Sequence, residues 1–467
     1  MIKIYNTLNK QIEEFKPLKS GRVLIYHCGP TVYWTQHIGN LRGMMFGDLL
    51  VRTFKYNDYE VKYIRNYTDV GHLSSDEDEG EDKMEKGAKR ENKTPLEIAQ
   101  KYIDIFEKDT KKLNLLEPNT KPRATEYIKE MQAMIQTLIN KGFAYETDLA
   151  VYFDVSKAKD YSRLSGQSEK DKIEGTGTGD IQDKNKKNPN DFALWFFRTN
   201  KHKNALQVWP STFKSKAVKD GLGFPGWHIE CSAMSKKLLS DSIDIHLGGI
   251  EHVPVHHTNE IAQSESANGI KYAGYWMHNE HLLVDNGKMS KSEGTNYSLA
   301  EIIKKGFDPL VLRFFFLSAQ YRSKQNFTWR ALLGAKNGLD HLRNQIRQLG
   351  EKKGSINSDY KNNFLQAINN DLNTPQALAV VQKLLKSNLN KKDKLATILD
   401  FDQVLGLDIN KTNDENVPEE AKKLLEKRNK ARADKDWTES DRLRTEIEKL
   451  GYTIEDLNNK TRVYKTD

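Results

Sequence analysis

The 467-residue sequence predicts an α/β protein in which a parallel sheet of the nucleotide-binding type is interrupted by an insertion and followed by an all-helical part. Three observations predict this fold. A strand, a helix and a second strand follow one another within the first 65 residues. Residues from about 70 to 220 contain long polar stretches that separate two apolar halves. After about residue 300, helical periodicity replaces the strand signals.

The first unit is a βαβ unit. Residues 22–27 are predicted as a short buried strand, and Gly29-Pro30 opens the loop that follows it. Apolar side chains then recur at helical spacing, at Leu41, Met44, Met45, Leu49 and Phe54. Residues 60–64 form the second strand. Because a parallel sheet binds its ligand at the carboxyl ends of the strands, we expect the site there.

The insertion is predicted over residues 71–220. It begins with an almost entirely charged stretch at residues 74–92, which is typical of a solvated loop or exposed helix. Residues 125–141 place Ile128, Met131, Ile135 and Leu138 on one helical face, and Gly142 follows as a C-terminal cap. The glycine-rich stretch at residues 167–190 is predicted as a loop or linker.

The C-terminal part is predicted to be all helical, from the periodicity at residues 310–317 and 367–385. In the last predicted helix, Thr438 is the expected N-cap and Asp441 the third residue, and Gly451 ends the helix.

Composition excludes several classes of protein. Charged residues make up 30% and hydrophobic residues 37% of the chain, which is typical of a globular rather than a disordered protein. No apolar run is long enough for a membrane span, and no secretory signal is present, so we expect a cytoplasmic protein. Two cysteines exclude a disulfide framework, and a net charge of +8 permits a polyanionic partner without proving one.

Histidines cluster in one stretch of the sequence. Seven of the 12 histidines fall within residues 228–281, which also contain Cys231. His256 and Glu260 are four residues apart, so on a helix both side chains project from one face and could share a metal ion. Two ordinary buried thiols and a surface His-Glu pair remain the alternative. If Cys28 and Cys231 meet His256 and Glu260, the four would form a zinc site.

Two further motifs fit phosphate binding, although each alone is equally well a polar loop or a helix cap. Lys288-Met289-Ser290-Lys291-Ser292 places ammonium and hydroxyl groups on a loop between Gly287 and Gly294. His37-Ile38-Gly39-Asn40 lies at the start of the first helix, where unpaired N–H groups and the helix dipole favour an anion. Together they resemble the paired signature of class I aminoacyl-tRNA synthetases and related nucleotidyl transferases.

Several stretches narrow this resemblance to the cysteinyl-tRNA synthetases, and they span nearly the whole chain: residues 26–33, 226–234, 256–263, 275–278, 370–375 and 428–432. The resemblance implies a Rossmann-type catalytic domain in two halves (1–70 and 221–300), a connective insertion (71–220), a stem-contact segment (301–345) and a helical anticodon-binding domain (346–467). It also implies a monomer that activates L-cysteine with ATP, aided by Mg²⁺, and transfers it to tRNA(Cys).

The resemblance assigns roles to individual residues. One Zn²⁺ would be held by Cys28, Cys231, His256 and Glu260, and would select the substrate thiolate. The amino-acid pocket would be shaped by Tyr33, Thr68, Trp227 and His246. ATP would be bound by His37, Gly39, Asn40, Lys288, Met289, Ser290, Lys291 and Ser292, with His37, Lys288 and Lys291 as the catalytic residues. The anticodon would be read by Arg432, Asp441 and Asp456.

Two positions depart from the family pattern. Asn40 stands where the family usually has a second histidine, and its amide can still donate a hydrogen bond. Glu251 occupies a position where the family more usually has an aspartate, and its longer side chain could reposition the amino group of the substrate.

Other interpretations remain open. A ligase that transfers cysteine from the same adenylate to an amino sugar would share the catalytic domain but would not need a tRNA-binding part. A non-catalytic zinc and RNA-binding module would not need the lysine loop. A zinc hydrolase is disfavoured, because four protein ligands leave no obvious position for a catalytic water.

Overall fold

The computed structural model describes residues 1–71, 83–167, 183–287, 289, 294–409, 418–457 and 460–465. Most of the predicted linker at residues 167–190, and the start of the charged stretch at residues 74–92, lie outside these residues.

The predicted parallel sheet is confirmed. Its four strands run in the order β10-β9-β3-β4, and every neighbouring pair is parallel. These strands are β3 (Arg22–His27), β4 (Glu60–Arg65), β9 (Ile243–Gly249) and β10 (Ala273–Asn279). The chain moves from β3 to β4 on one side and later adds β9 on the other side of β3, so the strand order reverses between β3 and β9. A ligand crevice is expected at that reversal, beyond the carboxyl ends of the strands.

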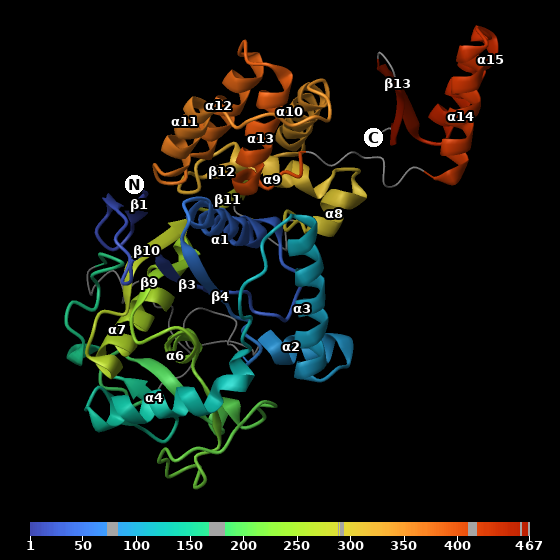
Figure 1. The fold of residues 1–467 in the computed structure, drawn as a ribbon. Coiled ribbons are helices and arrows are strands. Elements are labelled where there is room, and N and C mark those ends of the chain that lie inside the picture. The colour runs from blue at the N-terminus through green and yellow to red at the C-terminus, as the bar shows by residue number, and fades with distance from the viewer. Residues whose placement is uncertain are drawn as a thin grey trace.

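Helices cover both faces of this sheet (Figure 1). Along β3, Val23 and Ile25 pack in one apolar core with α1 (Ile38–Tyr56). Leu24 and Tyr26 point to the opposite face and pack in a second core, to which α6 (Trp227–Leu238) and α7 (His256–Asn268) contribute. The alternation follows from the two-residue side-chain period of a strand, and it explains why β3 is apolar throughout.

The insertion carries helices and a sheet of its own. The helical elements are α2 (Lys83–Glu91), α3 (Pro95–Lys112), η1 (Ala124–Tyr127), α4 (Ile128–Asn140), η2 (Val155–Lys157) and η3 (Asn200–His202). The strands are β5 (Ala144–Glu146), β6 (Ala150–Phe153), β7 (Phe192–Phe197) and β8 (Gly223–Pro225). They pair antiparallel in that order, which the sequence did not predict.

Short elements complete the catalytic half. They are β1 (Lys3–Asn6) with β2 (Gln11–Glu14), η4 (Ile250–His252), and β11 (Leu282–Val284) with β12 (Gln325–Phe327). A helical region follows, and part of it packs against α1, chiefly through α13. Its helices are α8 (Leu299–Lys304), α9 (Pro309–Leu317), α10 (Trp329–Arg347), α11 (Ser358–Ile368), α12 (Thr374–Lys386) and α13 (Lys391–Leu405).

The C-terminal module consists of α14 (Glu419–Ala433), α15 (Trp437–Lys449), β13 (Tyr452–Leu457) and β14 (Lys460–Lys465). Its small core contains Ala421, Ile447, Tyr452 and Ile454. The C-terminal part is mainly helical, as predicted, but it is not all helical, because it ends in this antiparallel hairpin. The predicted N-cap of α15 is wrong: Asp436, not Thr438, accepts the hydrogen bond from the backbone N–H of Glu439.

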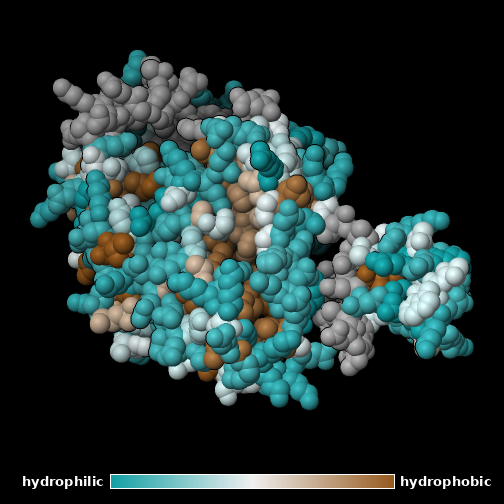
Figure 2. Space-filling view, turned by 90° about the horizontal axis from the view of Figure 1, so that it is seen from above, coloured by the Kyte–Doolittle hydropathy of each residue, from teal (hydrophilic) through white to brown (hydrophobic). Residues whose placement is uncertain are grey.

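The face of the molecule in Figure 2 is largely hydrophilic, and brown apolar residues appear in limited patches between polar ones. Among the described residues, no helix combines the length and the apolar character that crossing a bilayer requires.

Candidate active site and metal centre

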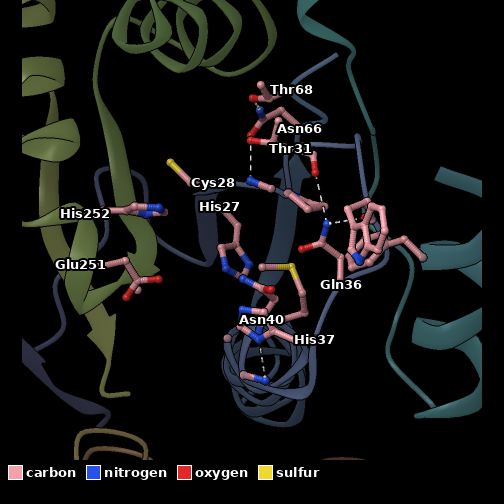
Figure 3. Close-up of a pocket in the computed structure, with 18 of the residues that line it drawn as sticks. His27, Cys28, Thr31, Gln36, His37, Asn40, Asn66, Thr68, Glu251 and His252 are labelled. Carbon is pink, nitrogen blue, oxygen red and sulfur yellow. Dashed lines mark hydrogen bonds between the residues drawn. The ribbon is translucent and has the colours of Figure 1, made fainter. Parts of the chain in front are cut away.

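A cavity of about 390 Å³ lies at the carboxyl ends of the four parallel strands, where the strand order reverses between β3 and β9. Figure 3 shows side chains from separate elements turned toward it: Cys28 after β3, Thr68 after β4, His37 and Asn40 at the start of α1, and Glu251 on the opposite wall. The cavity therefore gathers residues from both halves of the sheet domain.

Gly29 brings the loops after β3 and β4 together. Its N–H donates to the side-chain oxygen of Asn66 over 2.9 Å (Figure 3). A Cβ on Gly29 would lie 1.6 Å from the backbone oxygen of Asn66, so no larger residue fits without moving the backbone. The N–H of Val32 also donates to the carbonyl oxygen of Thr68 over 3.1 Å. These contacts fix Cys28 at the floor of the cavity.

Four buried groups meet beside the cavity: the thiols of Cys28 and Cys231, the imidazole of His256 and the carboxylate of Glu260. Their ligand atoms all lie within 4.8 Å of one another. Cys28 follows β3, Cys231 lies on α6, and His256 and Glu260 share one face of α7, as their spacing predicted. The structure therefore brings together all four residues of the predicted metal site, and their service as ligands stays a prediction.

Two of the distances within this group match the spacing of ligands around a tetrahedral metal ion, and a third is shorter. Sulfurs about 2.3 Å from zinc would lie about 3.8 Å apart, and a sulfur would lie about 3.6 Å from an oxygen that is about 2.1 Å from zinc. The two Sγ atoms are 3.7 Å apart, and Cys28 Sγ lies 3.6 Å from Glu260 Oε1. His256 Nε2 and Glu260 Oε1 are closer, at 2.9 Å, which is a hydrogen-bonding distance. Two thiols with one imidazole and one carboxylate are ligands that zinc accepts.

Further histidines surround the four groups. His246 Nε2 lies 2.8 Å from the second oxygen of Glu260, and His228 Nδ1 lies 2.9 Å from His256 Nδ1. His257 Nε2 lies 3.3 Å from Cys28 Sγ, and its Nδ1 contacts His278. Contacts of this kind orient metal ligands. A second possible group, Cys28, His246, His257 and Glu260, shares two members with the first. The sequence assigned no role to His228, His257 or His278, although their clustering was a signal.

Burial and charge together set the protonation of these groups. Burial raises the pKa of Glu260, but the nearby His246 and His256 outweigh it and hold the pKa well below its usual range. Burial lowers the pKa of His256, whereas Glu260 and Cys231 raise it to about 10. Burial raises the pKa of the Cys28 thiol, and the hydrogen bond from Cys28 lowers that of Cys231. Cys231 is thus the thiol that more readily becomes a thiolate.

The start of α1 forms the opposite end of the cavity. His37 is the N-cap, and its Nδ1 accepts hydrogen bonds from the N–H groups of Gly39 and Asn40, at 3.1 and 3.2 Å. Because Nδ1 is an acceptor, Nε2 carries the proton of the neutral ring. The cap therefore fixes which nitrogen of His37 is a donor. Asn40 lines the cavity beside it (Figure 3).

Met289 links the two motifs that the sequence predicts to bind the nucleotide. A Cβ on Gly39 would lie 2.2 Å from the Cε atom of Met289, so the loop after β11 touches the start of α1. Met289 also lines the cavity. The other predicted residues of this loop lie outside the described part of the chain: Lys288, Ser290, Lys291 and Ser292.

Three of the four predicted amino-acid-pocket residues line the cavity: Tyr33, Thr68 and Trp227. The Trp227 ring stacks on that of His256, with centroids 4.1 Å apart and an angle of 24°. Thr68 donates to Glu230 over 3.0 Å. His246 is fully buried behind Glu260 and is not among the lining residues. It is placed to orient Glu260 rather than to face the cavity.

The predicted anticodon residues lie in the C-terminal module. Arg432 on α14 donates to Asp456 on β13 over 2.9 Å, and the buried Arg428 binds both oxygens of the same carboxylate. Asp441 is exposed on α15. Two of the three predicted residues are thus paired with each other, and none of this tests their role in reading RNA.

Comparisons with known proteins first define the class. A model described as tRNA synthetases class I (C) catalytic domain matches residues 14–337, and one described as Cysteinyl-tRNA ligase anticodon binding domain matches residues 414–464. The solved methionyl-tRNA synthetase of Mycobacterium tuberculosis, in complex with methionyl-adenylate, has a TM-score of 0.55 at 12% identity, covering 83% of this chain and 90% of the other. That likeness shows the class I synthetase fold.

Curated relatives then define the family. Three relatives are each named cysteine-tRNA ligase, and the one from Burkholderia lata is named cysteine-tRNA ligase 1. The relative from Treponema denticola is 41% identical, covering 98% of this chain and 99% of its own. The relative from Burkholderia lata is 42% identical, covering 99% of this chain and 96% of its own. The relative from Lactococcus lactis is 38% identical, covering 99% of this chain and 100% of its own. The chain belongs to the cysteine-tRNA ligase family.

Proposed function

We propose that the chain activates L-cysteine with ATP and transfers the cysteinyl group to the 3′-terminal adenosine of tRNA(Cys). One observation carries this proposal. A single cavity is lined by two thiols and an imidazole of the buried group, whose carboxylate lies behind them, and by His37, Gly39 and Asn40 at the start of α1. A sulfur-bearing amino acid and a nucleotide would therefore lie next to each other.

In the first step, the carboxylate of cysteine attacks the α-phosphorus of ATP. A bond forms between the carboxylate oxygen and phosphorus, and the bond to the departing pyrophosphate breaks. Negative charge grows on the phosphate oxygens, so His37 Nε2–H, the Asn40 amide and the N-terminal end of α1 would stabilise it. Lys288 and Lys291 would act on the same charge, and Mg²⁺ would accompany ATP.

The buried group would hold one Zn²⁺ through Cys28, Cys231, His256 and Glu260. When bound, this ion would distinguish cysteine from the nearly isosteric serine, because it prefers a thiolate to a hydroxyl group. The chain's own residues orient the ligands: His246 fixes Glu260, and Trp227 stacks on His256. Tyr33 and Thr68 line the space that remains for the amino acid.

In the second step, a ribose hydroxyl of the terminal adenosine takes the cysteinyl group and AMP leaves. The C-terminal module would bind the tRNA, with Arg432, Asp441 and Asp456 at the anticodon. We also propose that the chain acts as a monomer in the cytoplasm, which its mass in solution and its distribution between cell fractions test.

The decisive experiment uses Cys231→Ser with pyrophosphate exchange as the measurement. Cysteine KM should rise at least tenfold, ATP KM should change little, and bound metal should fall, because a hydroxyl is a poorer ligand than a thiolate. Met234→Leu, buried on the same helix, is the matched control and should leave both KM values unchanged. An unaltered cysteine KM in the serine variant would contradict the metal's role in selecting cysteine.

Charging of tRNA separates this function from the nearest alternative. A ligase that acylates an amino sugar would catalyse cysteine-dependent pyrophosphate exchange but would not form cysteinyl-tRNA. The match of residues 414–464 to an anticodon-binding domain favours tRNA.

A further inference from the structure

The short helix η4 follows β9 and forms the wall of the cavity that faces Cys28. Glu251 and His252 both line this wall, and Figure 3 shows the His252 ring turned into the cavity, across from the Cys28 thiol. The His252 side chain is half-buried. It has no part in the two reaction steps proposed above, so the place of this polar ring beside the substrate needs an explanation.

Two glycines at the end of β9 make room for this wall. A Cβ on Gly248 would lie 2.6 Å from Nδ1 of His252 and 2.5 Å from Cε1 of His257. A Cβ on Gly249 would lie 2.2 Å from Oε1 of Glu251. No larger residue fits at either position unless these side chains move. Because Nδ1 of His252 faces the backbone of β9, Nε2 at the tip of the ring is the nitrogen that a ligand in the cavity would meet.

The His252 ring lies at the metal end of the cavity. Its centroid is 5.3 Å from that of His256, 5.1 Å from that of His257 and 5.9 Å from that of Trp227, whose ring is turned by 79°. Trp227 in turn stacks on His256. A substrate side chain that reaches the predicted ligands Cys28 and His256 would therefore pass along His252.

Three groups of the substrate need partners in this cavity. The carboxylate is directed to the nucleotide end, where it attacks the α-phosphorus. The ammonium group has a carboxylate beside it, because Glu251 precedes His252 on the same wall. The sulfur is the group that remains for His252, at the end where the two thiols and His256 line the cavity.

A hydrogen bond to the sulfur would favour cysteine over serine. A thiolate is an anion, and hydrogen bonds to ionised acceptors are about twice as strong as those between neutral groups. The hydroxyl group of serine stays protonated and neutral, so it gains less from the same donor. Such a donor adds to the preference that a thiolate-binding ion provides.

We propose that His252 determines specificity: its Nε2–H donates a hydrogen bond to the sulfur of the substrate cysteine and so disfavours serine. Gly248 admits the ring at this short distance from β9, and Glu251 takes the ammonium group of the same substrate. The inference rests on the proposed activation of cysteine by this chain.

The first test measures pyrophosphate exchange in the full-length enzyme. His252→Ala should raise the cysteine KM about tenfold and leave the ATP KM unchanged, because a hydrogen bond to a charged group is lost. The serine KM should change less than about twofold, so the preference for cysteine in kcat/KM should fall. His252→Gln keeps an N–H donor and should restore most of the cysteine KM. Ile250→Val, on the same turn and outside the cavity lining, is the matched control and should behave as the wild type.

Cobalt-substituted protein separates a contact with the substrate from a role in holding the metal. Wild type and His252→Ala should bind Co²⁺ equally and with the same absorption spectrum, because the four candidate ligands are unchanged. Cysteine should then add a sulfur-to-cobalt charge-transfer band, which should lie at longer wavelength in the variant because the sulfur loses its donor. A weaker Co²⁺ affinity or an altered cysteine-free spectrum in the variant would overturn the inference, since His252 would then only orient the ligands.

Two cysteine analogues identify the group that His252 contacts. 3-Mercaptopropionate keeps the thiol but lacks the ammonium group, and 2-aminobutyrate keeps the ammonium group but has a methyl group in place of the thiol. In His252→Ala, the inhibition constant of the first should rise about tenfold and that of the second should not change. The reverse pattern would assign His252 to the ammonium group, and unchanged constants for both would leave it without a substrate contact; either result overturns the inference.

The cobalt measurement does not depend on catalysis. If the wild-type protein shows no cysteine-dependent exchange, the proposed function fails. The band formed with 3-mercaptopropionate still tests the hydrogen bond in that case, because this ligand binds without being activated.

Discussion

Gly39 shows how a single residue joins two distant motifs. The Met289 side chain occupies the space that a Cβ at position 39 would need, so the loop after β11 reaches the helix that caps the nucleotide end of the cavity. Both motifs could be predicted from the sequence as phosphate-binding, because the glycine, histidine and lysine residues of each motif lie within one short segment. Sequence spacing alone could not give the contact between residues about 250 positions apart.

Asn40 is one of the two departures from the family pattern that line the cavity, and Glu251 is the other. If its amide donates to a phosphate of ATP, Asn40→Ala should lower the maximal rate of pyrophosphate exchange about fivefold, since a neutral hydrogen bond contributes about 1 kcal/mol. Asn40→His, which restores a donor, should recover most of that rate. An alanine variant as fast as the wild type would remove Asn40 from the nucleotide site.

Asp109 should make stability depend on pH. Burial raises its pKa to about 6 in the folded chain, although Lys112 opposes this, whereas an unfolded aspartate titrates near 3.9. The unfolded chain therefore loses the proton first, and stability falls as pH rises from about 4 to about 6. Asp109→Asn should raise the free energy of unfolding by about 2 kcal/mol at pH 7.5 and by almost nothing at pH 3.5. Urea denaturation at both pH values measures this, and equal gains would contradict it.

The helices and strands that could be predicted from the sequence are those whose signals lie within a single segment. The strand at residues 22–27 and the helix and strand after it were predicted because apolar periodicity and turn residues lie within each segment. The sheet β5–β8 was missed because its pairing joins Ala150–Phe153 to Phe192–Phe197 across a polar stretch. The cap of α15 was misplaced because Asp436 and Thr438, two residues apart, are both good caps.

Helix α1 is tied to the helical region by a buried charge network. Asp48 on α1 accepts from Arg52 over 2.9 Å and from Arg313 of α9 over 2.6 Å, and both arginines also donate to backbone carbonyls, including Leu405 at the end of α13. The start of α1 lines the cavity, so this network connects the helical region to the nucleotide end of the site.

Asp48→Ala should lower the free energy of unfolding by at least about 3 kcal/mol, because it leaves two buried guanidinium groups without their counter-ion. Urea denaturation monitored by tryptophan fluorescence is the measurement. Glu419→Ala breaks an exposed pair with Lys422 and should cost about 0.5 kcal/mol or less. Similar losses for the two variants would mean that the network contributes little.

For the whole molecule, the parallel sheet explains how the candidate metal ligands converge. Cys28 and Cys231 are far apart in the chain, yet the end of β3 and the helices α6 and α7 meet at one edge of the sheet. From the residues alone, two buried thiols and a surface pair were favoured over a metal site. Only the resemblance selected the four ligands in advance, because the distances among them depend on the complete fold.

The C-terminal module should be separable from adenylate formation. Its core of Ala421, Ile447, Tyr452 and Ile454 is distinct from the core that α1 shares with α9–α13, so removal of residues 410–467 exposes little of the catalytic half. The shortened protein should keep pyrophosphate exchange within about threefold of the full chain. Charging of tRNA should fall at least about 100-fold, because the proposed contacts of the module with the anticodon would be lost. Arg432→Ala, which leaves the module in place, should lower charging less. If the shortened protein charges tRNA as well as the full chain does, recognition of the tRNA must lie in the catalytic half and its insertion.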